Sequence, residues 1–111
     1  MFNLAQFFKC LSDETRLNAT LLIHQEGELC VCELMVAMDD SQPKISRHLA
    51  QLRNCGLLAD ERRGQWVFYK ISPAAPDWAM ALLKQACAAH QDTLSTLALK
   101  LKNMPDRPSC C

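Results

Sequence analysis

Apolar residues recur along the first quarter of the chain with the spacing of α-helices. Between residues 2 and 11 they occupy positions i, i+3, i+4 and i+7, which line up on one face of a helix. Ser12-Asp13-Glu14 then supplies an N-cap followed by acids in the first turn, where the helix dipole favours them, so a new helix is expected to start here. Its apolar face continues to about Gln25, and we expect Gly27 to end it. The pattern therefore predicts two consecutive helices.

The centre of the chain predicts a helix-turn-helix. A short helix is expected to follow Cys32, and Asp39-Asp40-Ser41 forms a polar turn after it. The next predicted helix, 42–55, has Pro43 in its first turn and Gly56 after its last residue. Its apolar stripe consists of Ile45, Leu49 and Leu52. Two short helices joined by a tight polar turn, the second of them basic, are typical of a helix-turn-helix.

The following segment predicts a β-hairpin. Residues 57–62 and 66–71 are expected to be strands, and the second is rich in aromatic and β-branched residues. Arg63-Gly64 supplies the turn between them, because glycine can adopt a positive φ. A hairpin directly after a basic helix is what the wing of a winged helix-turn-helix looks like. The alternative is a small hairpin that only covers the core.

The remainder of the chain predicts one long helix and a short tail. A proline-rich break at 72–76 is followed by helical spacing from 77 to about 102. Such a helix spans about 39 Å, so we expect part of its apolar face to contact a second copy of the chain. The fold class is mainly α with a hairpin wing, in the order ααααββα. Residues 1–103 are expected to form this domain and 104–111 a loose tail containing two cysteines.

Composition and charge narrow the classes of protein. The chain has 111 residues, enough for one small domain, and no run of 18 apolar residues that would cross a membrane. Its start lacks the features of a secretion signal, so we expect a cytoplasmic protein. The net charge is zero, but residues 1–40 carry −5, residues 41–70 carry +4 and residues 71–111 carry +1. Positive charge is thus concentrated where the basic helix and the hairpin would meet a polyanion.

The polar side of the 42–55 helix carries side chains that can bond to phosphates and base edges. We expect this helix to enter the major groove of double-stranded DNA and the hairpin tip to meet the flanking backbone. The predicted DNA-binding residues are Gln42, Lys44, Ser46, Arg47 and His48 on the helix, and Arg62 and Arg63 on the hairpin. Taken alone, the helix could also be an amphipathic helix with a solvated outer face. The hairpin that follows it favours DNA binding.

Seven cysteines in a chain without a secretion signal favour reduced thiols over a disulfide scaffold. Cys30 and Cys32 lie at a predicted helix start, where the dipole and free N–H groups lower the pKa of a thiol. If the chain is extended at Cys30 and helical by Cys32, their sulfurs can converge on a soft ion. The alternative is two small buried residues. Cys10, Cys55 and Cys87 are expected to pack within helices or at their ends.

Four segments together resemble the ArsR/SmtB family, and within it the arsenic-responsive repressors. They are DETRL at 13–17, GELCVCEL at 27–34, SQPKISRHL at 41–49 and GQWVFY at 64–69. The resemblance covers roughly residues 5–100. It implies a homodimer joined through its first and last helices and bound to the operator of an arsenic resistance operon. It also implies that As(III) or Sb(III) binds Cys30 and Cys32 and releases the DNA, for which no cofactor is needed.

One position departs from the three-thiol pattern of these repressors, because Met35 stands where they have a third cysteine. The third ligand is open among Cys10, Cys55, Cys110, Cys111, a small external thiol and the Met35 thioether. Other family members bind zinc on the last helix through paired His and acidic residues. Here that helix offers His90 and Asp92, and we expect no zinc site there.

The expected function is therefore a metalloid-responsive repressor rather than an enzyme. A repressor of the same fold that senses oxidants or another soft metal through Cys30 and Cys32, or oxidants through the tail thiols, is the alternative. A small thiol enzyme is the third possibility. It lacks support because the sequence shows no general base beside the cysteines, no βαβ pattern and no cofactor loop.

Overall fold

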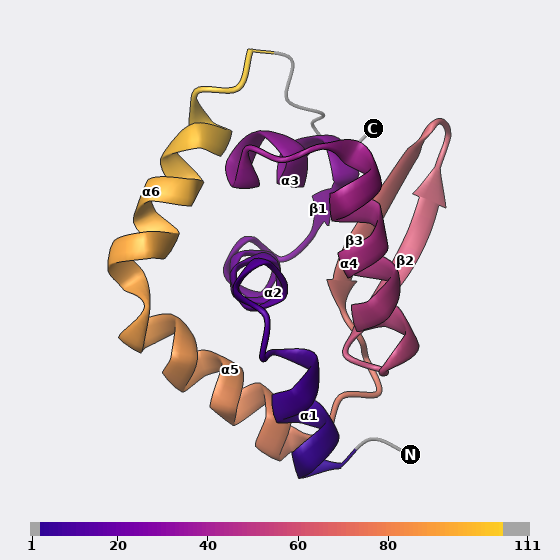
Figure 1. Cartoon of the computed structure of the whole chain (residues 1–111), viewed down its shortest axis with the longest axis vertical. Coiled ribbons are helices and arrows are strands. Elements are labelled where there is room, and N and C mark those ends of the chain that lie inside the picture. Colours follow the sequence, from indigo (N-terminus) through magenta and orange to yellow (C-terminus); the bar gives the residue numbers. More distant parts are fainter. Residues whose placement is uncertain (1–2, 106–111) are drawn as a thin grey trace.

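The computed structural model, which describes residues 3–105, contains six helices and a three-stranded antiparallel sheet (Figure 1). In chain order the elements are α1 Leu4–Cys10, α2 Glu14–Glu26, β1 Leu29–Cys30, α3 Val31–Met38, α4 Gln42–Asn54, β2 Leu58–Arg63, β3 Trp66–Ile71, α5 Asp77–Ala89 and α6 Gln91–Lys102. The predicted winged helix-turn-helix is confirmed, with one added strand and a divided last helix. Residues 106–111 of the predicted tail, with both of its cysteines, lie outside the described residues.

Helix α2 occupies the centre of the molecule, and the other helices lie around it (Figure 1). The N-cap of α2 lies within the predicted Ser12-Asp13-Glu14 start: it is Asp13, whose carboxylate accepts a hydrogen bond from the Arg16 N–H at 3.1 Å. Gly27 ends it with a φ of 97°. All six residues from Asn18 to Ile23 are buried, so the helix has no exposed face along that run. None of the helices in the described range is long and apolar enough to cross a membrane.

Strand β1 was absent from the sequence-based prediction. Its two residues pair with β3, Leu29 opposite Tyr69 and Cys30 opposite Phe68. Strand β3 pairs with β2 on its other side, so the strand order is β1-β3-β2. A two-residue strand has no alternating pattern to detect, and its pairing depends on a segment almost forty positions away. The pairing anchors the chain just before α3.

Helices α3 and α4 form the predicted helix-turn-helix. Asp39 ends α3 in the left-handed region, with a φ of 52°. Ile45, Leu49 and Leu52 of α4 are buried in the common core, as the apolar stripe predicted. Burying this stripe leaves the opposite side of α4 in solvent and fixes which of its polar side chains face outward.

The prediction of one helix over 77–102 is wrong, because the chain leaves the helix at His90. The Nε2 atom of His90 lies 2.7 Å from Oδ1 of Asn18, a buried residue of α2. The break lets α5 and α6 curve around α2 (Figure 1), and both helices bury apolar residues against their own chain. The length of a single C-terminal helix therefore no longer supports contact with a second copy of the chain.

Candidate nucleic-acid interface and thiol site

The outer side of α4, opposite its buried stripe, carries Arg47, and two further residues predicted to contact DNA are also exposed. Gln42, Lys44 and Arg47 are exposed, and Ser46 is half-buried. The Lys44 ammonium lies 3.9 Å from Asp40, but 60% of the Lys44 side chain is exposed, so the pair is weak. Arg47 has no ion pair with any residue in the 3–105 range. These side chains can therefore reach a polyanion without breaking strong internal contacts.

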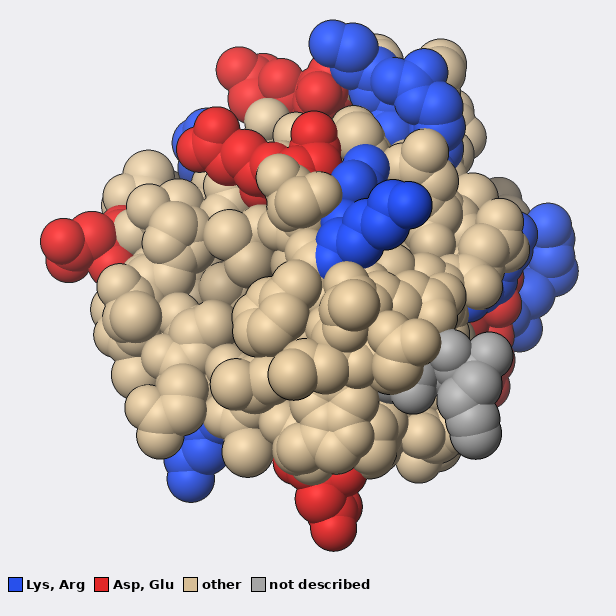
Figure 2. Space-filling model, turned by 60° about the horizontal axis from the view of Figure 1, so that its bottom comes forward, with Lys and Arg blue, Asp and Glu red and all other residues tan. Residues whose placement is uncertain are grey.

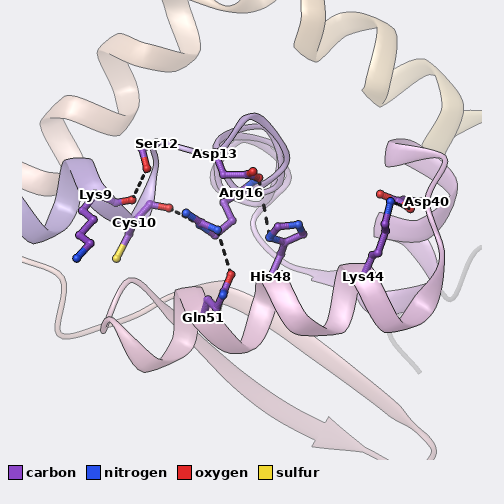
Figure 3. A network of polar contacts seen from close by, with 9 residues as sticks. All are labelled: Lys9, Cys10, Ser12, Asp13, Arg16, Asp40, Lys44, His48 and Gln51. Carbon is purple, nitrogen blue, oxygen red and sulfur yellow. Dashed lines mark hydrogen bonds and ion pairs between the residues drawn. The ribbon is translucent and has the colours of Figure 1, made fainter.

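The inner polar side of α4, which carries His48 and Gln51, faces the corner between α1 and α2, and Lys44 projects from the same side toward Asp40 (Figure 3). Arg16 of α2 links α1 to α4. Its Nε donates to the Cys10 carbonyl at 2.8 Å, and its Nη1 donates to Gln51 Oε1 at 3.0 Å. His48, predicted to contact DNA, has 16% of its side chain exposed, and its Nδ1 lies 3.9 Å from Asp13. Arg16 was not among the predicted site residues, because its partners Cys10 and Gln51 belong to two other elements of the fold.

The hairpin presents one of its two predicted arginines more openly than the other. Arg62 is exposed, whereas Arg63 makes two hydrogen bonds to the Glu28 carboxylate, at 2.6 and 2.8 Å, and one to Glu61 at 3.0 Å. The Arg63 guanidinium also lies 4.7 Å from the centroid of the Phe68 ring. Its hydrogen bonds hold the pKa of Glu28 below the usual value. Arg63 thus ties the hairpin to the segment before β1.

Cys30 and Cys32 lie where β1 gives way to α3. Cys30 is extended, with φ −89° and ψ 168°, and α3 begins at Val31, so the predicted backbone arrangement is confirmed. The Cys30 N–H donates to the Glu33 carboxylate at 2.9 Å. Cys30 is fully buried and Cys32 is half-buried. One thiol is therefore enclosed in the core, and the other is partly exposed to solvent.

The expected lowering of the thiol pKa is wrong for Cys30. Burial raises the pKa of Cys30 to about 11, although the N–H groups of Glu33 and Cys32 act in the opposite direction. The Glu33 carboxylate adds to the rise. Cys30 is thus a neutral thiol near pH 7, and a soft ion that binds it must displace its proton.

Cys32 lines an open pocket of about 670 Å³. Its other lining residues are Met35, Val36, Asp39, Asp40, Ser41 and Met104. Met104 follows α6, so the end of the described chain lies beside the start of the helix-turn-helix. A small ligand can reach Cys32 through this pocket.

The remaining described cysteines lie elsewhere in the fold. Cys10 and Cys55 are joined by a disulfide, so the expectation of reduced thiols is wrong for this pair. Cys87 is buried, with its sulfur 3.6 Å from His24 Nδ1. Between residues 3 and 105, no cluster of three or more His, Cys, Asp or Glu side chains could hold a metal ion. Cys30 and Cys32 therefore offer two sulfur donors, which suit a thiophilic ion, without a third Cys, His, Asp or Glu ligand from the described chain.

An apolar face lies at the end of the molecule formed by α1 and α5. Leu4 and Phe8 of α1 are 52% and 55% exposed, and Trp78 of α5 is 38% exposed. Leu4, Phe8 and Trp78 also line one open pocket of about 780 Å³. Figure 2 looks toward this end and shows few charged side chains over its middle. An exposed apolar face of this kind is typical of a protein interface.

Comparison with known proteins relates the whole chain to transcriptional regulators. Residues 13–60 match the family described as bacterial regulatory protein, arsR family. The arsenic resistance transcriptional regulator ArsR2 of Pseudomonas putida is 57% identical over 108 residues, which cover 94% of each chain. The arsenical resistance operon repressor of Escherichia coli is 50% identical over 96 residues, covering 86% of this chain and 82% of that one. Among solved structures, reduced HlyU from Vibrio cholerae has a TM-score of 0.70 at 29% identity, covering 78% of this chain and 86% of that one.

Proposed function

Since the chain belongs to the arsR family of bacterial regulatory proteins, we propose that it is a homodimeric repressor of arsenic resistance genes. It binds operator DNA in the cytoplasm through α4 and the hairpin. It leaves the operator when a trivalent arsenic or antimony species binds Cys30 and Cys32. Like its close relatives, the chain is a transcriptional regulator and not an enzyme. The observation that carries this proposal is the near full-length similarity to an arsenic resistance regulator.

The position of Cys30 supports a link between the thiols and the DNA-binding helix. Cys30 ends the strand that pairs with β3, and the next residue begins α3, which leads through a tight turn into α4. Binding an ion at the buried Cys30 thiol requires that thiol to become accessible or α3 to shift. Either change moves the start of the helix-turn-helix relative to the sheet. A coupling of about 1–3 kcal/mol between the two sites is enough for release.

The direct test is operator binding in the presence of arsenite. A labelled fragment from the region upstream of the protein's own gene is titrated with protein under reducing conditions, and arsenite is then added while anisotropy is followed. We expect wild type to release the fragment and the Cys30→Ser, Cys32→Ser variant to stay bound. Cys87→Ser, which removes a buried thiol from another part of the core, is the matched control and should behave as wild type.

Two results would contradict parts of the proposal. If the double variant releases DNA at the same arsenite concentration as wild type, Cys30 and Cys32 are not the ligands. If wild type binds the operator and neither arsenite nor antimonite releases it, the chain remains a DNA-binding regulator whose signal is a different one.

The dimer follows from the apolar face on α1 and α5 rather than from helix length. Replacing exposed Phe8 by Glu places a charge in the middle of this face. We expect Phe8→Glu to sediment as a monomer and to bind the operator at least about tenfold more weakly. Val36→Glu changes a half-exposed residue on α3 and should leave the dimer intact. A Phe8→Glu protein that sediments as wild type would place the dimer interface elsewhere.

A further inference from the structure

We propose that Cys10 and Cys55 form a second thiol site, which reacts with peroxides and closes reversibly into a disulfide. The structure joins the two sulfurs although the residues are 45 positions apart in the sequence. Cys10 is the last residue of α1, and Cys55 is the C-cap of α4. Disulfides in proteins of the reducing cytoplasm are mostly transient and regulatory. The bond therefore adds a reversible covalent tie between α1 and the DNA-binding helix.

Access and charge at this site suit a reactive thiol. Both cysteines are half-buried and line an open pocket of about 570 Å³. Lys9 and Arg16 line the same pocket. Nearby cations favour the thiolate form, which is the nucleophile in thiol oxidation. A small peroxide can therefore reach the two sulfurs through a pocket that also carries two cations.

The surrounding contacts hold the two thiols in place when the bond is open. Arg16 donates to the carbonyl of Cys10 on one side and to Gln51, one helical turn before Cys55, on the other. The close view shows the Cys10 sulfur directed toward the end of α4 (Figure 3). Because these hydrogen bonds do not involve sulfur, they remain in the reduced protein. The disulfide can thus form without rearranging the fold.

The chemistry balances with a peroxide as the oxidant. The thiolate of one cysteine attacks a peroxide oxygen, the O–O bond breaks, and a sulfenic acid forms while water or an alcohol leaves after protonation. The second thiol attacks the sulfenic sulfur, the S–O bond breaks, and water leaves as the S–S bond forms. Two thiols are oxidised by two electrons and one peroxide is reduced. A dithiol reductant reopens the bond through a mixed disulfide.

The effect on regulation rests on the proposed function. Release of the operator requires α4 to move relative to the dimer-forming helix α1, and the closed disulfide opposes that movement. The oxidised protein is thus expected to hold its operator at arsenite concentrations that release the reduced protein. The outer side of α4 is exposed in this disulfide-linked structure, so DNA binding itself is expected to persist.

The site can be tested without DNA or metalloid. Reduced full-length protein is treated with one equivalent of hydrogen peroxide, quenched with acid, alkylated and digested with trypsin without reduction. Cys10 lies in the tryptic peptide 10–16, Cys55 in 54–62, and both Cys30 and Cys32 in 17–44. We expect mass spectrometry to detect peptide 10–16 linked to 54–62, and dithiothreitol to separate them. Peptide 17–44 should remain alkylated at both cysteines.

Three variants define the outcome. Cys10→Ser and Cys55→Ser should each lose the linked peptide, whereas Cys87→Ser should form it at the wild-type rate. If wild type yields no link between 10–16 and 54–62, or yields disulfides only within 17–44, the proposal is overturned. The presence or absence of the linked peptides in wild type decides the test, so the outcome does not depend on whether a variant folds well.

A second measurement separates the site from its regulatory effect. Oxidised and reduced wild type, with peptide 17–44 verified as unoxidised, are titrated with arsenite on the operator fragment. We expect oxidised protein to need at least about tenfold more arsenite for half-release, and Cys10→Ser to show no peroxide dependence. Equal midpoints for oxidised and reduced wild type would overturn the regulatory effect. Failure of both forms to respond to arsenite would contradict the proposed function and leave the peptide result standing.

Discussion

The two polar sides of helix α4 differ in what they contact, although their residues look alike in the sequence. On the outer side, Arg47 extends into solvent and makes no ion pair with any residue in the 3–105 range. On the inner side, His48 and Gln51 face Asp13 and Arg16 at the corner between α1 and α2. One helix therefore carries a surface available for DNA and a polar contact that fixes its position.

This difference shows how a short helix can be both exposed and precisely placed. The apolar stripe buries α4, but hydrophobic packing alone is not directional and leaves some freedom to slide. Hydrogen bonds through Arg16 have defined distances and angles, so they set the register of α4 against α1. Changes on the outer side should therefore alter DNA affinity, and changes on the inner side should alter stability.

The largest effect is expected from Arg47→Ala. Removing an exposed cation from the outer side should weaken operator binding at least about tenfold, because contacts of this type contribute about 1–3 kcal/mol. The control is Gln51→Ala, which removes an inner-side amide and should change affinity less than about threefold. Anisotropy titrations measure both, and urea unfolding checks that Arg47→Ala remains as stable as wild type. Equal losses of affinity for the two variants would erase the distinction between the sides.

A smaller effect is expected from Arg16→Lys in the reduced protein. Lysine keeps the charge but cannot donate in the forked geometry that joins Cys10 to Gln51, so the free energy of unfolding should fall by about 1 kcal/mol. Arg53→Lys, which alters an exposed ion pair with Asp60, should cost less than about 0.5 kcal/mol. Urea unfolding compares the two variants. A loss for Arg53→Lys as large as that for Arg16→Lys would mean that the corner has no special role.

The smallest effect concerns pH. The hydrogen bond from the Arg16 N–H holds the pKa of Asp13 below its usual 3.8, and the nearby His48 acts in the same direction. Charged Asp13 therefore adds stability above about pH 3.8, and this contribution is lost as the pH falls through the lower folded value. Asp13→Asn keeps a good capping residue but removes the charge. Urea unfolding between pH 7 and pH 3 should show wild type slightly more stable than the variant at neutral pH, with the gap closing in acid. If the difference in unfolding free energy between wild type and Asp13→Asn does not change with pH, the difference comes from helix capping and not from the charge of Asp13.

The features that could be predicted from the sequence depend on near neighbours in the chain. Asp13 and Gly27 mark the ends of α2, and the buried stripe of α4 follows from helical spacing alone. The extended backbone at Cys30, followed at once by helix, also follows from local signals. The fold class was therefore predictable, and the assignment of DNA-binding and thiol residues stays a prediction.

The features that could not be predicted depend on partners distant in the sequence. Neither Gly nor Pro marks the break at His90, which coincides with a hydrogen bond to Asn18, 72 positions earlier. The disulfide joins cysteines 45 positions apart, and Arg63 pairs with Glu28, 35 positions earlier. The high pKa of Cys30 results from burial, which a helix-start argument does not include. Each of these features requires knowledge of which elements are adjacent in space.

The position of Met104 in the wall of the Cys32 pocket has a consequence for how the protein is made. A ribosome delivers the chain from its N-terminus, so α4 and the hairpin emerge before α6 and Met104. A nascent or truncated chain that ends before α6 contains the residues predicted to contact DNA but lacks one wall of the pocket beside Cys32. The pocket beside Cys32 is therefore completed only after α4 and the hairpin have been synthesised.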